Sequence, residues 1–132
     1  MLMITLPAMT QEKSIMDILE STAWQNVEEK DVYIVFKNDT LIKYSRDIFT
    51  GEKRVITDVF YLSDVLDEEF DNTKIGKNKN GKYLLSHSIR VKRLFSYEIN
   101  TVNENELTLE ITEMVFGGGQ TSTYRAYSGK VE

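Results

Sequence analysis

The residues of this 132-residue chain that come closest to a chemical motif lie in the stretch IGKNKNGKY, residues 75–83. Gly76 is followed after four residues by Gly81 and Lys82, the spacing of a phosphate-binding loop. Such a loop needs a Ser or Thr after the lysine and then a helix, whose free N–H groups hold the phosphate. Here a tyrosine follows and the next residues have the composition of a strand. We therefore predict a turn at Asn80-Gly81, a dipeptide that tolerates positive φ, and no nucleotide site.

The single histidine, His87, is the residue best suited to acid–base chemistry. Alternation places it on one face of its strand with Tyr83 and Leu85, and we expect this face to point inward. A chain with one histidine and no cysteine cannot build a His-rich zinc site or a Cys–His pair, and no G-x-S-x-G nucleophile elbow is present. We therefore assign no catalytic residue. An isomerase or lyase that pairs His87 with an inward carboxylate such as Asp58 remains the third of three alternatives.

Two other stretches have compositions that suit a binding loop. DVLDEEFD, residues 64–71, carries five carboxylates, but their spacing departs from the D-x-[DN]-x-[DN]-G calcium loop. We predict a solvated acidic loop beside the lysines that follow, with no metal and no cofactor. The glycines at 117–119 separate two alternating segments, which predicts a hairpin loop. A loop of this kind at the mouth of a barrel can contact a ligand.

The elements that position these residues are strands that follow one short helix. Ser14 is a good N-cap, and the apolar residues within 15–22 recur at helical spacing. From Trp24 onward the period is two, with a tight turn predicted at Asn38-Asp39. The expected strands are residues 24–28, 32–37, 40–45, 53–63, 82–88, 92–100, 106–116 and 122–128. Consecutive strands without helices between them favour an antiparallel meander, so we predict an all-β, eight-stranded up-and-down barrel.

Length and charge restrict the class of protein further. A chain of 132 residues fits one domain, which we place at residues 12–132. A net charge of -5 argues against nucleic acid and anionic membranes as partners. Cysteine is absent, which excludes disulfides and thiolate metal sites but does not decide the compartment.

The N-terminal stretch MLMITLPAMTQ, residues 1–11, is apolar but too short to span a membrane, and it lacks the basic start of a signal peptide. Its Leu6-Pro7-Ala8 resembles the residues before a signal-peptidase cut. We interpret it as a signal-peptide remnant or, as an equal alternative, as a disordered arm.

Aromatic residues supply the remaining signal for a binding site. Barrel interiors that bind ligands combine apolar rings with a few polar groups, whereas packed interiors use the same rings as filling. The sequence leaves both alternatives open. The candidate cavity residues are Phe36, Tyr44, Tyr61, Tyr83, His87, Phe95, Tyr97 and Tyr124.

A series of short segments resembles the small bacterial lipocalin-like domains, between about Ser14 and Gly129. The segments are STAW, YIVFKNDTLIKY, VFYLSD, FDNTKIGKNKNGKYLL, YEINTVNENELTLEI and YRAY. The resemblance implies a helix followed by a calycin-type barrel, usually in exported proteins, most of which have no assigned ligand. In lipocalins proper an arginine near the last strand stacks over a tryptophan of the first. Trp24 and Arg125 match these two positions, although Thr22 stands where the family has glycine.

From these observations we expect a non-enzymatic, exported protein, periplasmic, on the outer surface or secreted. It would bind a small apolar or amphipathic molecule at the open end of the barrel. The main alternative is a filled barrel that acts as an interaction or inhibitor module through loops such as residues 64–80.

Overall fold

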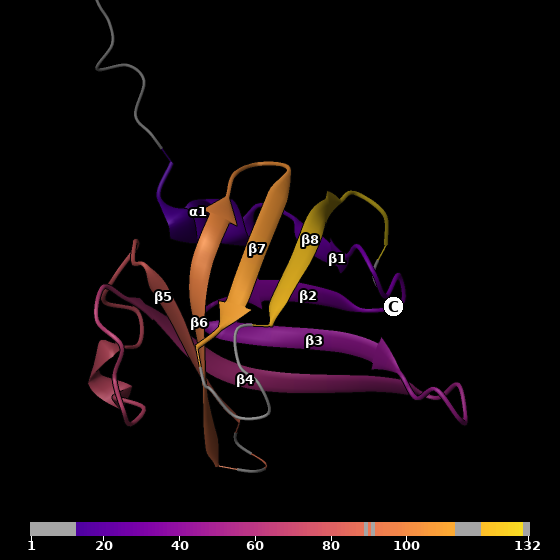
Figure 1. The fold of residues 1–132 in the computed structure, drawn as a ribbon, viewed down its shortest axis with the longest axis horizontal. Coiled ribbons are helices and arrows are strands. Elements are labelled where there is room, and N and C mark those ends of the chain that lie inside the picture. The colour runs from indigo at the N-terminus through magenta and orange to yellow at the C-terminus, as the bar shows by residue number, and fades with distance from the viewer. Residues whose placement is uncertain (1–12, 89, 91, 113–119, 131–132) are drawn as a thin grey trace, which may run out of the picture.

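The computed structural model describes residues 13–88, 90, 92–112 and 120–130 of the chain. Within these residues it contains one α-helix, one 3-10 helix and eight β-strands (Figure 1). In chain order the elements are α1 (Ile15–Glu20), β1 (Ala23–Asn26), β2 (Tyr33–Lys37), β3 (Thr40–Arg46), β4 (Lys53–Ser63), η2 (Asn72–Lys74), β5 (Tyr83–Ser88), β6 (Arg93–Val102), β7 (Glu106–Ile111) and β8 (Thr121–Tyr127).

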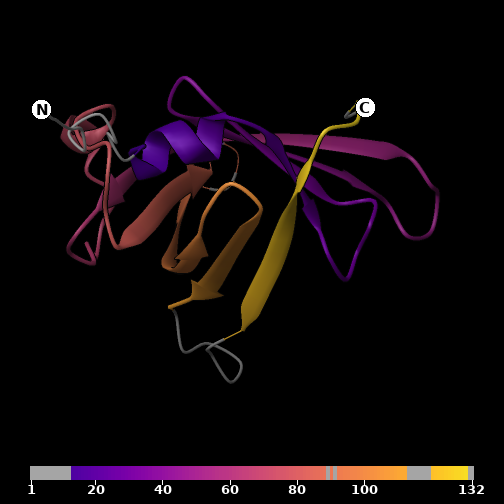
Figure 2. The ribbon, with the colours of Figure 1, turned by 90° about the horizontal axis from the view of Figure 1, so that it is seen from above.

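The strands form a closed antiparallel barrel in sequence order, as the sequence predicts (Figures 1 and 2). Strand β1 closes it, because Trp24 lies opposite Ile34 of β2 on one side and Ala126 of β8 on the other. The fold is up-and-down, all-β and compatible with a calycin-type barrel. No helix in the described part of the chain is long and apolar enough to cross a membrane.

The local signals read from the sequence explain the first elements. The predicted tight turn is confirmed, because Asn38 and Asp39 have φ values of 49° and 65° between β2 and β3. The side chain of Ser14 accepts a hydrogen bond from Asp17 N at 3.1 Å and caps α1. The predicted strand 106–116 ends at Ile111, and its residues 113–116, with the triple glycine, lie outside the described residues.

Helix α1 packs its apolar face against one end of the barrel, which we call the closed end. Met16 and Leu19 are buried in the core cluster there. The indole Nε1 of Trp24 donates to Leu19 O at 3.0 Å, and Lys13 pairs with Glu104 of the β6–β7 connection at 3.5 Å. The helix therefore covers the closed end of the barrel.

The expected stacking of Arg125 over Trp24 is wrong. Arg125 pairs with Gln25 in the β1–β8 register, and its side chain is exposed. Because neighbouring residues of a strand point to opposite faces, Trp24 lies inside the barrel and Arg125 outside it.

The connection between β4 and β5 also differs from its prediction. Gly81 is buried and lacks a positive φ, so it is not the turn residue that the Asn80-Gly81 dipeptide indicates. A Cβ added to Gly81 would lie 2.5 Å from Ser63 N, so glycine is needed for close backbone approach to β4. The strand after it, β5, confirms that no phosphate-binding helix follows.

The same connection lies at the closed end. Asn80 Oδ1 accepts from Ile15 N at 2.8 Å and Lys79 O accepts from Met16 N at 2.9 Å, which ties the connection to the start of α1.

Candidate ligand-binding cavity

The interior of the barrel is filled at the closed end and hollow at the other. Phe36 and Phe60 meet edge to face with ring centroids 5.2 Å apart. Around them the fully buried side chains of Trp24, Leu62 and Leu84 complete the packed half. Beyond this layer the inner face lines a partly open cavity of about 460 Å³, to which α1 contributes no residue.

The wall of this cavity is mostly apolar. Seven strands, β2 to β8, contribute inward-facing residues to it. The apolar lining residues are Ile34, Leu41, Ile56, Phe95, Leu109 and Ile111. Of these, Ile34 and Leu109 also belong to the buried core. They form the bottom of the cavity, where the hollow half of the barrel meets the filled half.

A few polar groups converge on the same space. Lys43 and Arg90 have exposed side chains and mark the rim, whereas Tyr124 is only 9% exposed. Burial raises the pKa of Tyr124, so its hydroxyl stays protonated. The other polar lining residues are Asp58, Ser88, Tyr97 and Ser122.

Asp58 is the acidic group of the cavity wall. In the register it lies between Leu41 of β3 and Ser88 of β5. Its Oδ1 is buried and has no hydrogen-bond partner among the described residues. Burial raises the pKa of Asp58, while electrostatic interactions with His87 and Lys43 act in the opposite direction.

Three of the eight residues predicted from the sequence line this cavity, namely Phe95, Tyr97 and Tyr124. Phe36 points inward but belongs to the packed closed end.

The other four predicted residues lie on the outer face of the barrel. Alternation with inward neighbours places them there, since Lys43, Phe60, Leu84, Ser86 and Ser88 belong to the inner face. The outward residues are Tyr44, Tyr61, Tyr83 and His87.

The expectation that the His87 face points inward is wrong. This face is apolar because residues of the β4–β5 connection cover it on the outside of the barrel. The ring of His87 stacks on Phe70 with centroids 5.2 Å apart, and Phe70 also packs on Tyr61 at 4.8 Å. The acidic segment thus lies on the outside of β4 and β5. His87 and Asp58 point to opposite faces of the sheet, so the acid–base pair of the third alternative is not brought together.

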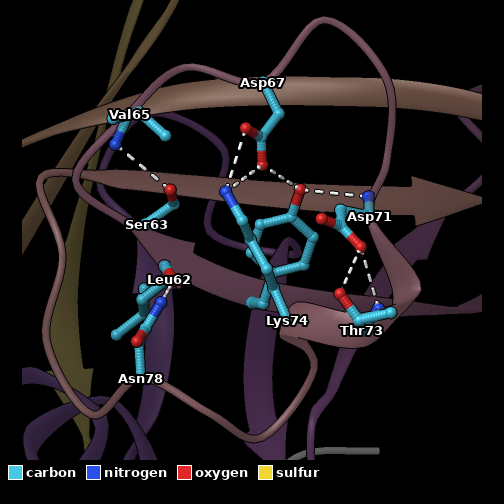
Figure 3. A network of polar contacts seen from close by, with 9 residues as sticks. Leu62, Ser63, Val65, Asp67, Asp71, Thr73, Lys74 and Asn78 are labelled. Carbon is cyan, nitrogen blue, oxygen red and sulfur yellow. Dashed lines mark hydrogen bonds and ion pairs between the residues drawn. The ribbon is translucent and has the colours of Figure 1, made fainter.

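Polar contacts hold this outer cover in place (Figure 3). Asp67 accepts from the Tyr61 hydroxyl at 2.6 Å and from Lys74 Nζ at 2.8 Å, and Asn78 Nδ2 donates to Leu62 O at 2.9 Å. The bonds from Lys74 and Tyr61 lower the pKa of Asp67. Burial, assisted by the bond to Asp67, raises the pKa of Tyr61 to about 12.

The acidic stretch is therefore in part a structural clasp. Asp71 caps η2 by accepting from Thr73 N at 3.0 Å, beside the Asp67–Lys74 pair. In the ranges that the structure covers, no group of three or more His, Cys, Asp or Glu residues could hold a metal ion.

Several lining residues escaped the sequence prediction, chiefly Leu41, Lys43, Ile56, Ser88 and Arg90. The inner phase of β4 could have been found, because Ile56, Phe60 and Leu62 share a face with Asp58. This alternation is a weak signal for the inward face of β4, because Val59 and Tyr61 make its opposite face equally apolar.

Comparisons with protein-family models, curated proteins and solved structures find no match to this chain. The class of protein is therefore defined by its own geometry: a closed, eight-stranded antiparallel barrel with one capped, filled end and a cavity at the other.

Proposed function

We propose that this protein is a non-enzymatic, lipocalin-like binding protein that holds one small apolar or amphipathic molecule in the open half of its barrel. The observation that carries the proposal is the cavity of about 460 Å³. Ligand pockets typically measure about 300–1,000 Å³ and combine apolar walls with a few placed polar groups. The cavity has both properties. A barrel with one hollow half supports ligand binding better than the alternative of a filled barrel.

The separation of His87 from Asp58 supports a binding role over the acid–base chemistry of the third alternative. His87 stacks on Phe70 outside the barrel, whereas the cavity carboxylate, Asp58, lies inside it. General acid–base catalysis requires its groups within hydrogen-bond reach of one substrate, directly or through one water.

A titration with the neutral dye Nile red tests the proposal. The dye fluoresces more strongly in apolar surroundings, so we expect a saturable increase at one dye per protein. Ile56→Trp fills the cavity from β4 and should weaken binding at least about tenfold, since a ligand excluded from an apolar pocket loses its buried area.

Val55→Trp is the matched control. Val55 is the neighbouring residue of β4 and is 55% exposed on the outer face, so the same ring there should leave dye affinity unchanged. Equal affinity in both variants and the native protein would contradict binding in the cavity.

We also propose that the protein is exported, on the basis of residues 1–11 and the lipocalin-like resemblance. N-terminal sequencing of protein from its native host tests this. A mature end near Met9 to Gln11 supports export, and an intact Met1 argues against it.

A further inference from the structure

One oxygen of the cavity wall, Oδ1 of Asp58, is buried without a hydrogen-bond partner among the described residues. Buried polar atoms in folded proteins are nearly always hydrogen-bonded, because an unpaired one loses its bonds to water without replacement. Asp58 also lines the cavity, so rotation of its side chain would turn its carboxylate toward whatever occupies the barrel.

The neighbouring side chains do not neutralise this carboxylate by direct pairing. Leu41, its partner in the β3 register, is apolar. Lys43 lies on the same inner face and lowers the pKa of Asp58 through its charge, yet no ion pair joins Asp58 to Lys43 or to Arg90 in the described part of the chain.

An ionised carboxylate only accepts hydrogen bonds, so its missing partner must be a donor. Once the side chain turns toward the cavity, water can serve in the unliganded protein. A ligand that displaces this water with a methylene group leaves the oxygen unpaired, whereas one that brings a hydroxyl or ammonium group restores the bond. The wall therefore discriminates between ligands by the polar group that reaches Asp58.

We propose that the cavity selects an apolar molecule that carries a hydrogen-bond donor, a hydroxyl or a protonated amine, and that this donor bonds to the Asp58 carboxylate. The inference rests on the proposed binding function and names the chemistry of its ligand. Ile56 and Leu41 flank Asp58, so the apolar part of the ligand lies against the same wall.

A carboxylic acid is the competing ligand. Lys43 and Arg90 would attract its anionic head to the rim, but exposed cations are screened by water and salt. Beside Asp58 the same head would place two like charges together, which is unfavourable in a partly buried site. The relative affinities of matched ligands therefore decide whether Asp58 in the wall or the two cations at the rim determine which head group is preferred.

The test displaces Nile red from the native protein with decanol, decylamine and decanoate at neutral pH. These probes share one alkyl chain and differ only in the head group. We expect decanol and decylamine to bind more tightly than decanoate by roughly ten- to a hundredfold, the range given by one hydrogen bond to a charged group.

Two variants assign the preference to Asp58. Asp58→Leu keeps an aliphatic side chain of similar size and removes both oxygens, and Asp58→Asn removes the charge alone. We expect the preference for a donor to disappear in the first and to shrink in the second, with Nile red affinity retained. Asp64→Asn, an exposed carboxylate that follows β4 at the closed end, is the control and should keep the full preference.

Each result has a defined meaning. Equal affinities, or a preference for decanoate, with Nile red still displaced would overturn the donor selectivity while leaving the binding function in place. Native-like preference in Asp58→Leu would also overturn it. Failure of Nile red to bind the native protein would instead overturn the proposed function. Tighter binding of only decanol or only decylamine would support the inference and identify the donor.

Discussion

At the scale of single residues, the barrel places its unusual groups on two different faces. Inside, Asp58 occupies a wall that is otherwise mainly apolar. Outside, the Tyr61 hydroxyl of β4 donates a hydrogen bond of 2.6 Å to Asp67 of the β4–β5 connection. The two sites differ in their hydrogen bonding. Tyr61 and Asp67 each make a further hydrogen bond, with Asp71 N and Lys74 Nζ, whereas Oδ1 of Asp58 has no partner among the described residues. An unsatisfied group inside a cavity is a feature of binding sites that trade stability for function.

This trade predicts that Asp58→Asn stabilises the empty protein near neutral pH. Because burial raises the pKa of Asp58 above 3.8 in the folded state, the native protein loses stability as pH rises through that folded value. Below the unfolded value the carboxyl is protonated in both states and this loss vanishes. Thermal unfolding should therefore show a higher midpoint for Asp58→Asn at neutral pH, with the gain shrinking in acid. A gain that does not depend on pH would contradict this explanation.

At the scale of elements, the alternation in the sequence located the strands but did not reliably show which face of each strand points into the barrel. The order of the strands, the cap at Ser14 and the turn at Asn38-Asp39 follow from local chemistry, and all three are confirmed. In β4 both faces are apolar, because one packs inside the barrel and the other lies under Phe70. Alternation alone cannot then decide which face points inward, and His87 was placed on the wrong side for the same reason.

Longer-range contacts account for the other failures. Trp24 was expected to meet an arginine from β8, but the helix α1 supplies the cover instead. The role of Gly81 depends on a β4 residue that lies far from it in the sequence, so no local signal could reveal it. Of the cavity, the apolar phase of β6 and the inward position of Asp58 were predicted from the sequence, whereas the rim residues Lys43 and Arg90 were not.

Gly81 gives a prediction at this scale. Its replacement by alanine would place a methyl group 2.5 Å from Ser63 N and 3.0 Å from the carbonyl carbon of Leu62, both backbone atoms. The strand and its connection must move apart, so we expect a loss of about 1–3 kcal/mol in the free energy of unfolding, measured by urea denaturation.

The neighbouring Lys82→Ala serves as the comparison. Lys82 is exposed, and its ion pair with Glu98 spans 3.9 Å, so its removal should cost less than about 0.5 kcal/mol. A Gly81→Ala protein as stable as Lys82→Ala would show that the close approach to β4 is not a constraint.

At the scale of the whole molecule, the barrel is divided along its axis. Helix α1 and the β4–β5 connection close one end, where the core is packed. The other end keeps about 460 Å³ free. A packed half of this kind can hold the hollow half in shape without a ligand, which is the preorganisation that favours binding.

The most direct test of this division is an amide NMR titration of isotope-labelled protein with decanol. We predict that the largest shifts fall on residues of the hollow half, such as Leu41, Ile56 and Asp58, and saturate at one ligand per protein. Residues of the packed half, such as Leu62 and Leu84, should change little. Shifts confined to the outer face of the barrel, or the absence of saturable shifts, would contradict a ligand site inside it.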